Sequence, residues 1–158
     1  MERVNQIRNH PLYQEHMRKI LKLEKERIFC GHGPEHLLDV ARLAWIMNLE
    51  LGLGYEKSVV YGAALIHDIG RAMEYESGIS HEEGSRLLGA GILPDCGYRK
   101  EEQELMLEAV ASHRKAREKQ DLNWLLYRAD KMSRLCFACP AEQLCDWPSE
   151  KKNMEIKG

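Results

Sequence analysis

Histidine and aspartate residues recur at positions where predicted helices face an apolar interior. Imidazole nitrogens and carboxylate oxygens are ligands that suit divalent Mn, Fe, Co, Ni, Zn or Mg rather than copper(I). Burying an aspartate is costly unless it is paired, hydrogen-bonded or coordinated to a cation. Helix bundles commonly build metal sites from facing helices, so the pattern predicts a divalent-metal site inside such a bundle. The candidate residues are His36, His67, Asp68, His81, His113 and Asp130.

The His67-Asp68 dipeptide is the centre of this pattern. It ends an apolar run that begins at Ala63, and it is followed by Gly70, a residue type favoured just past a helix end. Adjacent residues diverge by about 100° around a helix axis, so both side chains reach one ion only at the end of the helix. Taken alone, the dipeptide favours a plainer interpretation, a capping aspartate beside a hydrogen-bonded core histidine, because short motifs often match by chance.

Helices are the elements that must position these residues, because the chain shows no alternation of period two and no internal repeat. Ser80 and Glu83 form a capping box, which places His81 at the first position of a helix. Apolar residues follow His36 at a helical period, which places His36 near an inward face. The expected helices run over about 11–27, 34–51, 56–68, 81–91, 99–119 and 122–135.

The order His, then His-Asp, then Asp resembles the HD-domain superfamily of metal-dependent phosphohydrolases. The matching stretches are 34–41, 64–71 and 127–131, and the resemblance covers about residues 10–135. It implies an all-α, HD-domain-like helical bundle with the metal site in its interior. The ligands that it implies are His36, His67, Asp68 and Asp130.

The number of metal ions stays open between one and two. In members of the superfamily with two metals, extra histidines fall between the His-Asp pair and the last aspartate, and His81 and His113 stand at matching positions. With one metal, His81 or His113 could instead protonate the leaving oxygen. Asp68 could orient the attacking water or bridge two ions.

Arg71 is a candidate for binding the substrate, together with His81 and His113. It lies one turn beyond the His-Asp pair, where a guanidinium could grip a phosphate with two hydrogen bonds. Some members of the superfamily have lysine near that position. A surface arginine paired with Glu74 is the equally weighted alternative.

The chemistry expected of this site is phosphate hydrolysis. A bound metal lowers the pKa of a coordinated water and neutralises charge on a phosphoryl oxygen. We predict an enzyme that hydrolyses a phosphate ester or anhydride of a small nucleotide or related phosphometabolite, as a phosphomonoesterase, phosphodiesterase or nucleotide pyrophosphohydrolase. The alternatives are an HD-fold di-iron oxygenase and a non-catalytic, metal-stabilised binding module.

The composition describes an ordinary globular protein of one domain. The 158 residues carry 44% hydrophobic and 30% charged side chains, and the formal net charge is −2. This charge disfavours bulk nucleic acid as a partner. No apolar run approaches the roughly 20 residues that span a bilayer, so we predict a cytoplasmic protein without a membrane partner, with a homodimer as a reasonable expectation.

Three of the five cysteines crowd near the C-terminus, at Cys136, Cys139 and Cys145. We predict an HD domain over 1–135 and a cysteine-containing tail over 136–158 that packs on the same domain. Three thiols can supply three ligands of a structural zinc, with Cys30, Cys96 or a histidine as the fourth. Small buried thiols that only pack, or a redox pair or cluster, are the alternatives.

Overall fold

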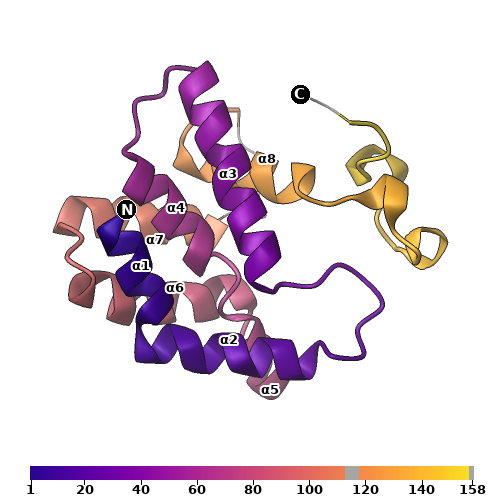
Figure 1. Ribbon diagram of the computed structural model, residues 1–158, viewed down its shortest axis with the longest axis horizontal. Helices are drawn as coiled ribbons and strands as arrows, with labels where there is room; N and C mark the ends of the chain where they lie inside the picture. Colours follow the sequence, from indigo (N-terminus) through magenta and orange to yellow (C-terminus); the bar gives the residue numbers. More distant parts are fainter. Residues whose placement is uncertain (113–117, 157–158) are drawn as a thin grey trace.

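The computed structural model describes residues 1–112 and 118–156, and within these ranges the regular structure is entirely helical. Figure 1 shows helices packed around α3 and α4, with the C-terminal segment extending from the end of α8. This confirms the predicted all-α fold. The α-helices are α1 (Glu2–Asn9), α2 (Pro11–Leu23), α3 (Pro34–Glu50), α4 (Lys57–Ile66), α5 (Arg71–Ser77), α6 (His81–Asp95), α7 (Lys100–Ser112) and α8 (Leu122–Met132).

Helix α4 is the centre of the core, and α3, α7 and α1 pack against it. A helix that is apolar on every side is stable only when neighbours cover all of it. Its buried residues are Val59, Val60, Gly62, Ala63, Ala64, Leu65 and Ile66. Because α4 ends inside the protein, the residues that follow it, His67 and Asp68, are buried as well.

The turn after α4 is pressed against the start of α6. The backbone N–H of Gly70 donates to Oγ of Ser85 at 2.9 Å. A Cβ atom at Gly70 would lie 2.3 Å from the backbone oxygen of His81 and 2.3 Å from the backbone nitrogen of Ser85. Glycine is therefore required here by close approach of two backbones, and this approach brings His81 beside Asp68.

Substituting Gly70 by alanine is expected to destabilise the protein by about 3 kcal/mol, because both obstructing atoms belong to the backbone and neither can rotate away. Gly91→Ala is the matched control, since a Cβ there meets its nearest atom at 3.6 Å and alanine favours the helix by up to about 1 kcal/mol. Chemical denaturation of both variants measures the difference. Equal stabilities would contradict the close packing of α6 on this turn.

Several helix boundaries differ from the sequence prediction. Helix α6 was expected to end by Gly89 and Gly91, but it continues to Asp95. The expectation was wrong because Gly89 is in the helix to make room for its neighbours and not to end it. A Cβ at Gly89 would lie 2.9 Å from the side chain of Leu107 and 3.0 Å from that of Ile66. Helices α1 and α5 were not predicted, and α2 and α8 end three to four residues early. Helix α7 is described as far as Ser112, so its expected end lies outside the described residues.

Up to residue 156, where its description ends, the regular structure of the segment after α8 consists of short 3-10 turns, namely η1 (Cys136–Ala138), η2 (Glu142–Leu144) and η3 (Ser149–Lys151). Asn153 ties it to the end of α8, since its Nδ2 donates to the backbone oxygens of Met132 at 3.0 Å and Arg134 at 3.2 Å. The division into 1–135 and 136–158 stays a prediction. None of the helices in the described ranges has the length and apolarity needed to cross a membrane.

Candidate metal centre

Four of the predicted ligands come together in the interior. His36 lies in the first turn of α3, His67 and Asp68 follow α4, and Asp130 lies near the end of α8. Each offers one donor atom, and all four donors lie within 4.8 Å of one another. Nε2 of His36 is 3.5 Å from Oδ2 of Asp68 and 3.4 Å from Oδ1 of Asp130, and Nε2 of His67 is 3.1 Å from Oδ2 of Asp68. Three separate parts of the chain thus present two imidazoles and two carboxylates to one point.

Hydrogen bonds fix which nitrogen of each imidazole faces this point. Nδ1 of His67 lies 2.7 Å from the backbone oxygen of Ala64, which only accepts, so Nδ1 carries a proton. The hydroxyl of Ser133 donates to the backbone oxygen of Asp130 at 2.8 Å and therefore accepts from Nδ1 of His36 at 3.1 Å. Both Nε2 atoms then face the carboxylates with the lone pair that a metal needs. This arrangement of partners is typical of metal-binding histidines.

The carboxylates of the cluster are held in their charged forms. Burial alone would raise the pKa of Asp68, but His67 and His36 lower it well below its ordinary value. Burial likewise opposes ionisation of Asp130, and the contact with His36 and the charge of Lys131 lower its pKa. Two ionised carboxylates and two imidazoles are a donor set that suits a divalent cation. The buried group can therefore hold a metal, whereas the part that each residue plays stays a prediction.

His81 lies beside this cluster, and its predicted role in catalysis or second-metal binding stays a prediction. Its Nε2 is 3.6 Å from Oδ1 of Asp68, and its Nδ1 is 3.1 Å from Glu74 and 3.4 Å from Glu82. His81, Glu74 and Glu82 form a second group whose donors lie within 4.8 Å of one another. His113, the other candidate for a second metal or for catalysis, lies outside the described residues.

Arg71 makes the predicted pair with Glu74, and its role in binding substrate stays a prediction. Its Nη1 pairs with Glu74 at 2.8 Å, but it is not a surface residue, because its Nε lies 3.3 Å from Oδ1 of Asp68 and only 20% of its side chain is exposed. The two oxygens of Asp68 therefore face different partners. Oδ2 lies toward His36 and His67, and Oδ1 lies toward Arg71 and His81.

The cluster borders, through Asp130, a cavity of about 340 Å³. Basic side chains dominate its lining, with aromatic rings beside them. Lys131 connects the two kinds, since its Nζ is 2.7 Å from Asp130 and lies 4.6 Å from the ring centre of Trp147. The lining residues are Arg27, Phe29, Cys30, His32, Arg71, Tyr127, Asp130, Lys131, Arg134, Cys145, Asp146, Trp147 and Lys151.

Comparison with known protein families decides the assignment. The family model described as HD domain matches residues 34–135, a range that contains all four donors of the buried cluster. The chain belongs to the HD domain family. HD domains bind divalent metals and form a superfamily of metal-dependent phosphohydrolases. This confirms the resemblance drawn from the sequence.

Relatives of this HD domain include a protein of the same length and much longer ribonucleases. An uncharacterized protein of Clostridium beijerinckii is 41% identical over 156 residues, which is 99% of either chain. Ribonuclease Y of Acetivibrio thermocellus is 33% identical over 66% of this chain, and Ribonuclease Y of Sulfurovum sp. is 33% identical over 65%. The chain spans only 18% of the length of either ribonuclease. No solved structure matches the chain.

Sequence reasoning missed the surroundings of His32 in this HD domain. The loop position of His32 predicts a residue that is exposed or at the rim of a pocket. The side chain lines the cavity but is buried, and its Nε2 lies 4.0 Å from Oδ2 of Asp68. Glu24, just after α2, bonds both the ring of His32 and its backbone N–H, the latter at 2.7 Å. Burial opposes ionisation of Glu24, but hydrogen bonds from His32 and Tyr75 lower its pKa to about 2. An irregular loop joins these residues, so no periodic pattern indicated the contact.

Arg134 is the second residue of the HD domain that sequence reasoning missed. Its Nη2 lies 2.8 Å from Nε2 of His36 and 3.3 Å from Oδ1 of Asp130, and its Nη1 donates to the backbone oxygen of Gly31 at 2.8 Å. A guanidinium and a metal ion compete for the same two donor atoms. Metal binding therefore requires Nη2 to leave them, which would release a cation at the wall of the cavity. Its spacing of four residues from Asp130 was the available signal.

Proposed function

We propose that this HD domain hydrolyses phosphate esters or anhydrides of small nucleotides with a divalent metal held by His36, His67, Asp68 and Asp130. The observation that carries the proposal is that the buried donor cluster borders a cavity lined by cations and aromatic rings. The cationic side chains of this cavity can bind a phosphate, and its aromatic rings can stack on a nucleobase. The Ribonuclease Y relatives support chemistry at phosphate, although their names refer to much longer proteins.

When bound, the metal would lower the pKa of a coordinated water and offset negative charge on the phosphoryl group. Asp68 would connect the metal ligands to the guanidinium, because its Oδ2 faces His67 while its Oδ1 faces Arg71. The two ends of its carboxylate thereby set the distance between the metal ligands and the guanidinium. Arg71 is placed to bind a phosphate oxygen while its Nη1 stays paired with Glu74.

His81 suits the role of metal ligand or base better than that of acid. Burial and the charge of Arg71 lower its pKa, so it is neutral at pH 7 and carries a single proton. Glu74, 3.1 Å from Nδ1, accepts that proton in a hydrogen bond. Nε2 then faces Asp68 without a proton to give to a leaving group. This favours the second-metal alternative over protonation of the leaving oxygen by His81.

A panel of phosphate substrates tests the proposal. Chelator-treated protein would be supplied with Mn, Fe, Co, Ni, Zn or Mg in turn, and offered nucleoside monophosphates, nucleoside triphosphates, a dinucleotide diester and a long RNA. We expect metal-dependent turnover of the small nucleotides. Consumption of oxygen without phosphate release would instead indicate the di-iron oxygenase, and preferred cleavage of the long RNA would contradict a small substrate.

Replacing Lys131 by methionine is expected to raise KM for the preferred nucleotide by about tenfold, because a charge-assisted hydrogen bond to phosphate contributes about 1.5 kcal/mol or more. Lys57→Met is the matched control. Lys57 also lies over aromatic rings, 5.5 Å from those of Trp45 and Tyr61, but it is not among the residues that line the cavity. Steady-state kinetics of both variants checks this prediction, and an equal KM in the two would contradict a phosphate contact for Lys131.

A further inference from the structure

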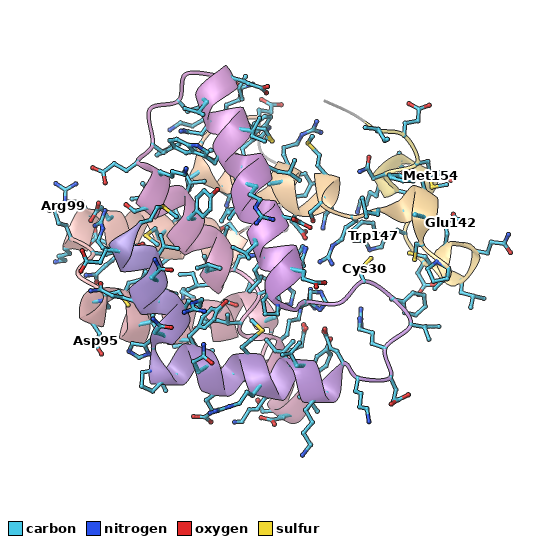
Figure 2. The ribbon with its side chains drawn as sticks, in the orientation of Figure 1. Cys30, Asp95, Arg99, Glu142, Trp147 and Met154 are labelled. Carbon is cyan, nitrogen blue, oxygen red and sulfur yellow. The ribbon has the colours of Figure 1, made fainter. Side chains whose placement is uncertain are left out.

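Four cysteines from two distant parts of the chain line a small cavity of about 20 Å³ beside the larger one. Cys30 comes from the loop between α2 and α3, and the other three, Cys136, Cys139 and Cys145, come from the C-terminal segment. Figure 2 shows Cys30 on that loop, facing the segment that carries Glu142 and Trp147. All four thiols are free of disulfides. The sequence alone left the fourth ligand open between Cys30, Cys96 and a histidine, and Cys30 is the one that lies at this cavity.

We propose that Cys30, Cys136, Cys139 and Cys145 are the ligands of a second metal centre, separate from the histidine-carboxylate site. The backbone of the segment favours convergence of its three sulfurs. The N–H of Cys139 donates to the backbone oxygen of Cys136, that of Glu142 to Cys139, and that of Cys145 to Glu142, each at 3.1 Å. Each bond closes a turn that brings its first and last residues close together.

The C-terminal segment lacks a core that would hold it in place. Leu135, Phe137 and Leu144 are 63%, 44% and 67% exposed, and the segment forms only 3-10 turns. Short segments that bury so little apolar surface are usually stabilised by disulfides or a metal. A metal bound to Cys30 would fasten this segment to the HD domain.

The four sulfur atoms are near enough to affect one another electrostatically. Burial raises the pKa of the Cys30 thiol, the charge of Arg134 opposes this, and the nearby Cys136, Cys139 and Cys145 raise the pKa further. Four thiolates would repel one another at this cavity unless a cation lay between them. Lys152 lines the cavity, but its Nζ already donates to Oε1 of Glu142 at 2.7 Å and to the backbone oxygen of Glu142 at 2.9 Å.

Four cysteines suit either a single zinc or an iron–sulfur cluster. Four thiolates around one zinc, each about 2.3 Å from it, lie about 3.8 Å apart. A cluster binds its cysteines through different iron atoms and needs more room between them than a single ion does. The zinc and sulfide contents of the protein distinguish the two.

The centre also borders the proposed substrate cavity. Cys30, Cys145 and Trp147 line both cavities. Loss of the metal would therefore detach from Cys30 the part of the substrate-cavity wall that carries Trp147. This consequence rests on the proposed function, whereas the metal centre itself does not.

The test is the content of iron, acid-labile sulfide and zinc per chain in protein purified without oxygen or chelators. Cys30→Ser and Cys139→Ser are compared with Cys96→Ser, which changes the buried cysteine at the end of α6. We expect either one zinc, or iron and sulfide in equal amounts, in the wild type and in Cys96→Ser, and loss of that zinc or of the sulfide in the other two. Metal at the histidine-carboxylate site should persist in every variant. This expectation holds whether or not the protein proves to have phosphatase activity.

Unchanged zinc, iron and sulfide in both variants, or a wild type whose metal is held at the histidine-carboxylate site alone, would overturn the proposal. Zinc that disappears in both variants identifies a single ion, and sulfide that disappears identifies a cluster. If Cys30→Ser does not fold, the metal content of Cys139→Ser and Cys145→Ser decides.

Discussion

Substitution of Asp68 by alanine is expected to abolish metal binding at the buried cluster and to lower kcat/KM by about a thousandfold or more. Asp68 is the one member of the cluster whose oxygens face both the imidazoles and Arg71. Its loss therefore removes a ligand and the partner that positions the guanidinium. Metal analysis and steady-state kinetics of the purified variant measure the two effects separately.

Asp39→Ala is the control for this substitution. Asp39 is also an aspartate of the HD domain, but it is exposed and pairs with Arg42 on the outer face of α3. We expect it to keep both metal and activity. An Asp68→Ala protein that retained the metal content and the rate of the control would refute the assignment of the buried cluster.

Removal of the metal is expected to lower the melting temperature by about 10 °C. An ion that binds only the folded protein, at a free concentration about a thousand times its Kd, stabilises by about 4 kcal/mol. For a chain of this length, each kcal/mol shifts the melting temperature by about 2–4 °C. Thermal melts with chelator, and again after manganese is restored, measure this shift. Asp130→Asn, which weakens only the histidine-carboxylate site, should show little response to manganese; a full response would place the stabilising ion elsewhere.

This stabilisation is expected to weaken as the pH falls. Burial opposes protonation of His67, but Asp68 raises its pKa above the ordinary value of 6.5. Because Nδ1 already donates to Ala64, the additional proton goes to Nε2, the atom that a metal would need. Protons therefore compete with metal below this raised pKa, and the manganese-dependent shift should be larger at pH 8 than at pH 6. A shift that grew on acidification would contradict His67 as a ligand.

The core of the site could be predicted because its signals are local. His67 and Asp68 end an apolar helix, His36 opens another, and the capping residue Ser80 fixes the place of His81. Each of these positions follows from helix period and capping within a few residues. The resemblance to the HD-domain superfamily indicated His36, His67 and Asp68 as well.

What the sequence did not reveal depends on contacts between distant segments. Glu24 and His32 meet across an irregular loop, and Cys30 faces a segment from the other end of the chain. Neither contact follows a periodic pattern. Gly89 was misread for a related reason, since its low helix propensity is outweighed by the close packing of neighbouring side chains.

The most direct test of the account is phosphate release during titration of manganese into chelator-treated protein, with the preferred small nucleotide as substrate. Bound metal and released phosphate are measured in the same samples. We predict that the rate rises in proportion to the occupancy of the histidine-carboxylate site and stops rising when that site is full. Release that is already maximal without metal, or that never appears when the site is full, would contradict a metal-dependent phosphohydrolase.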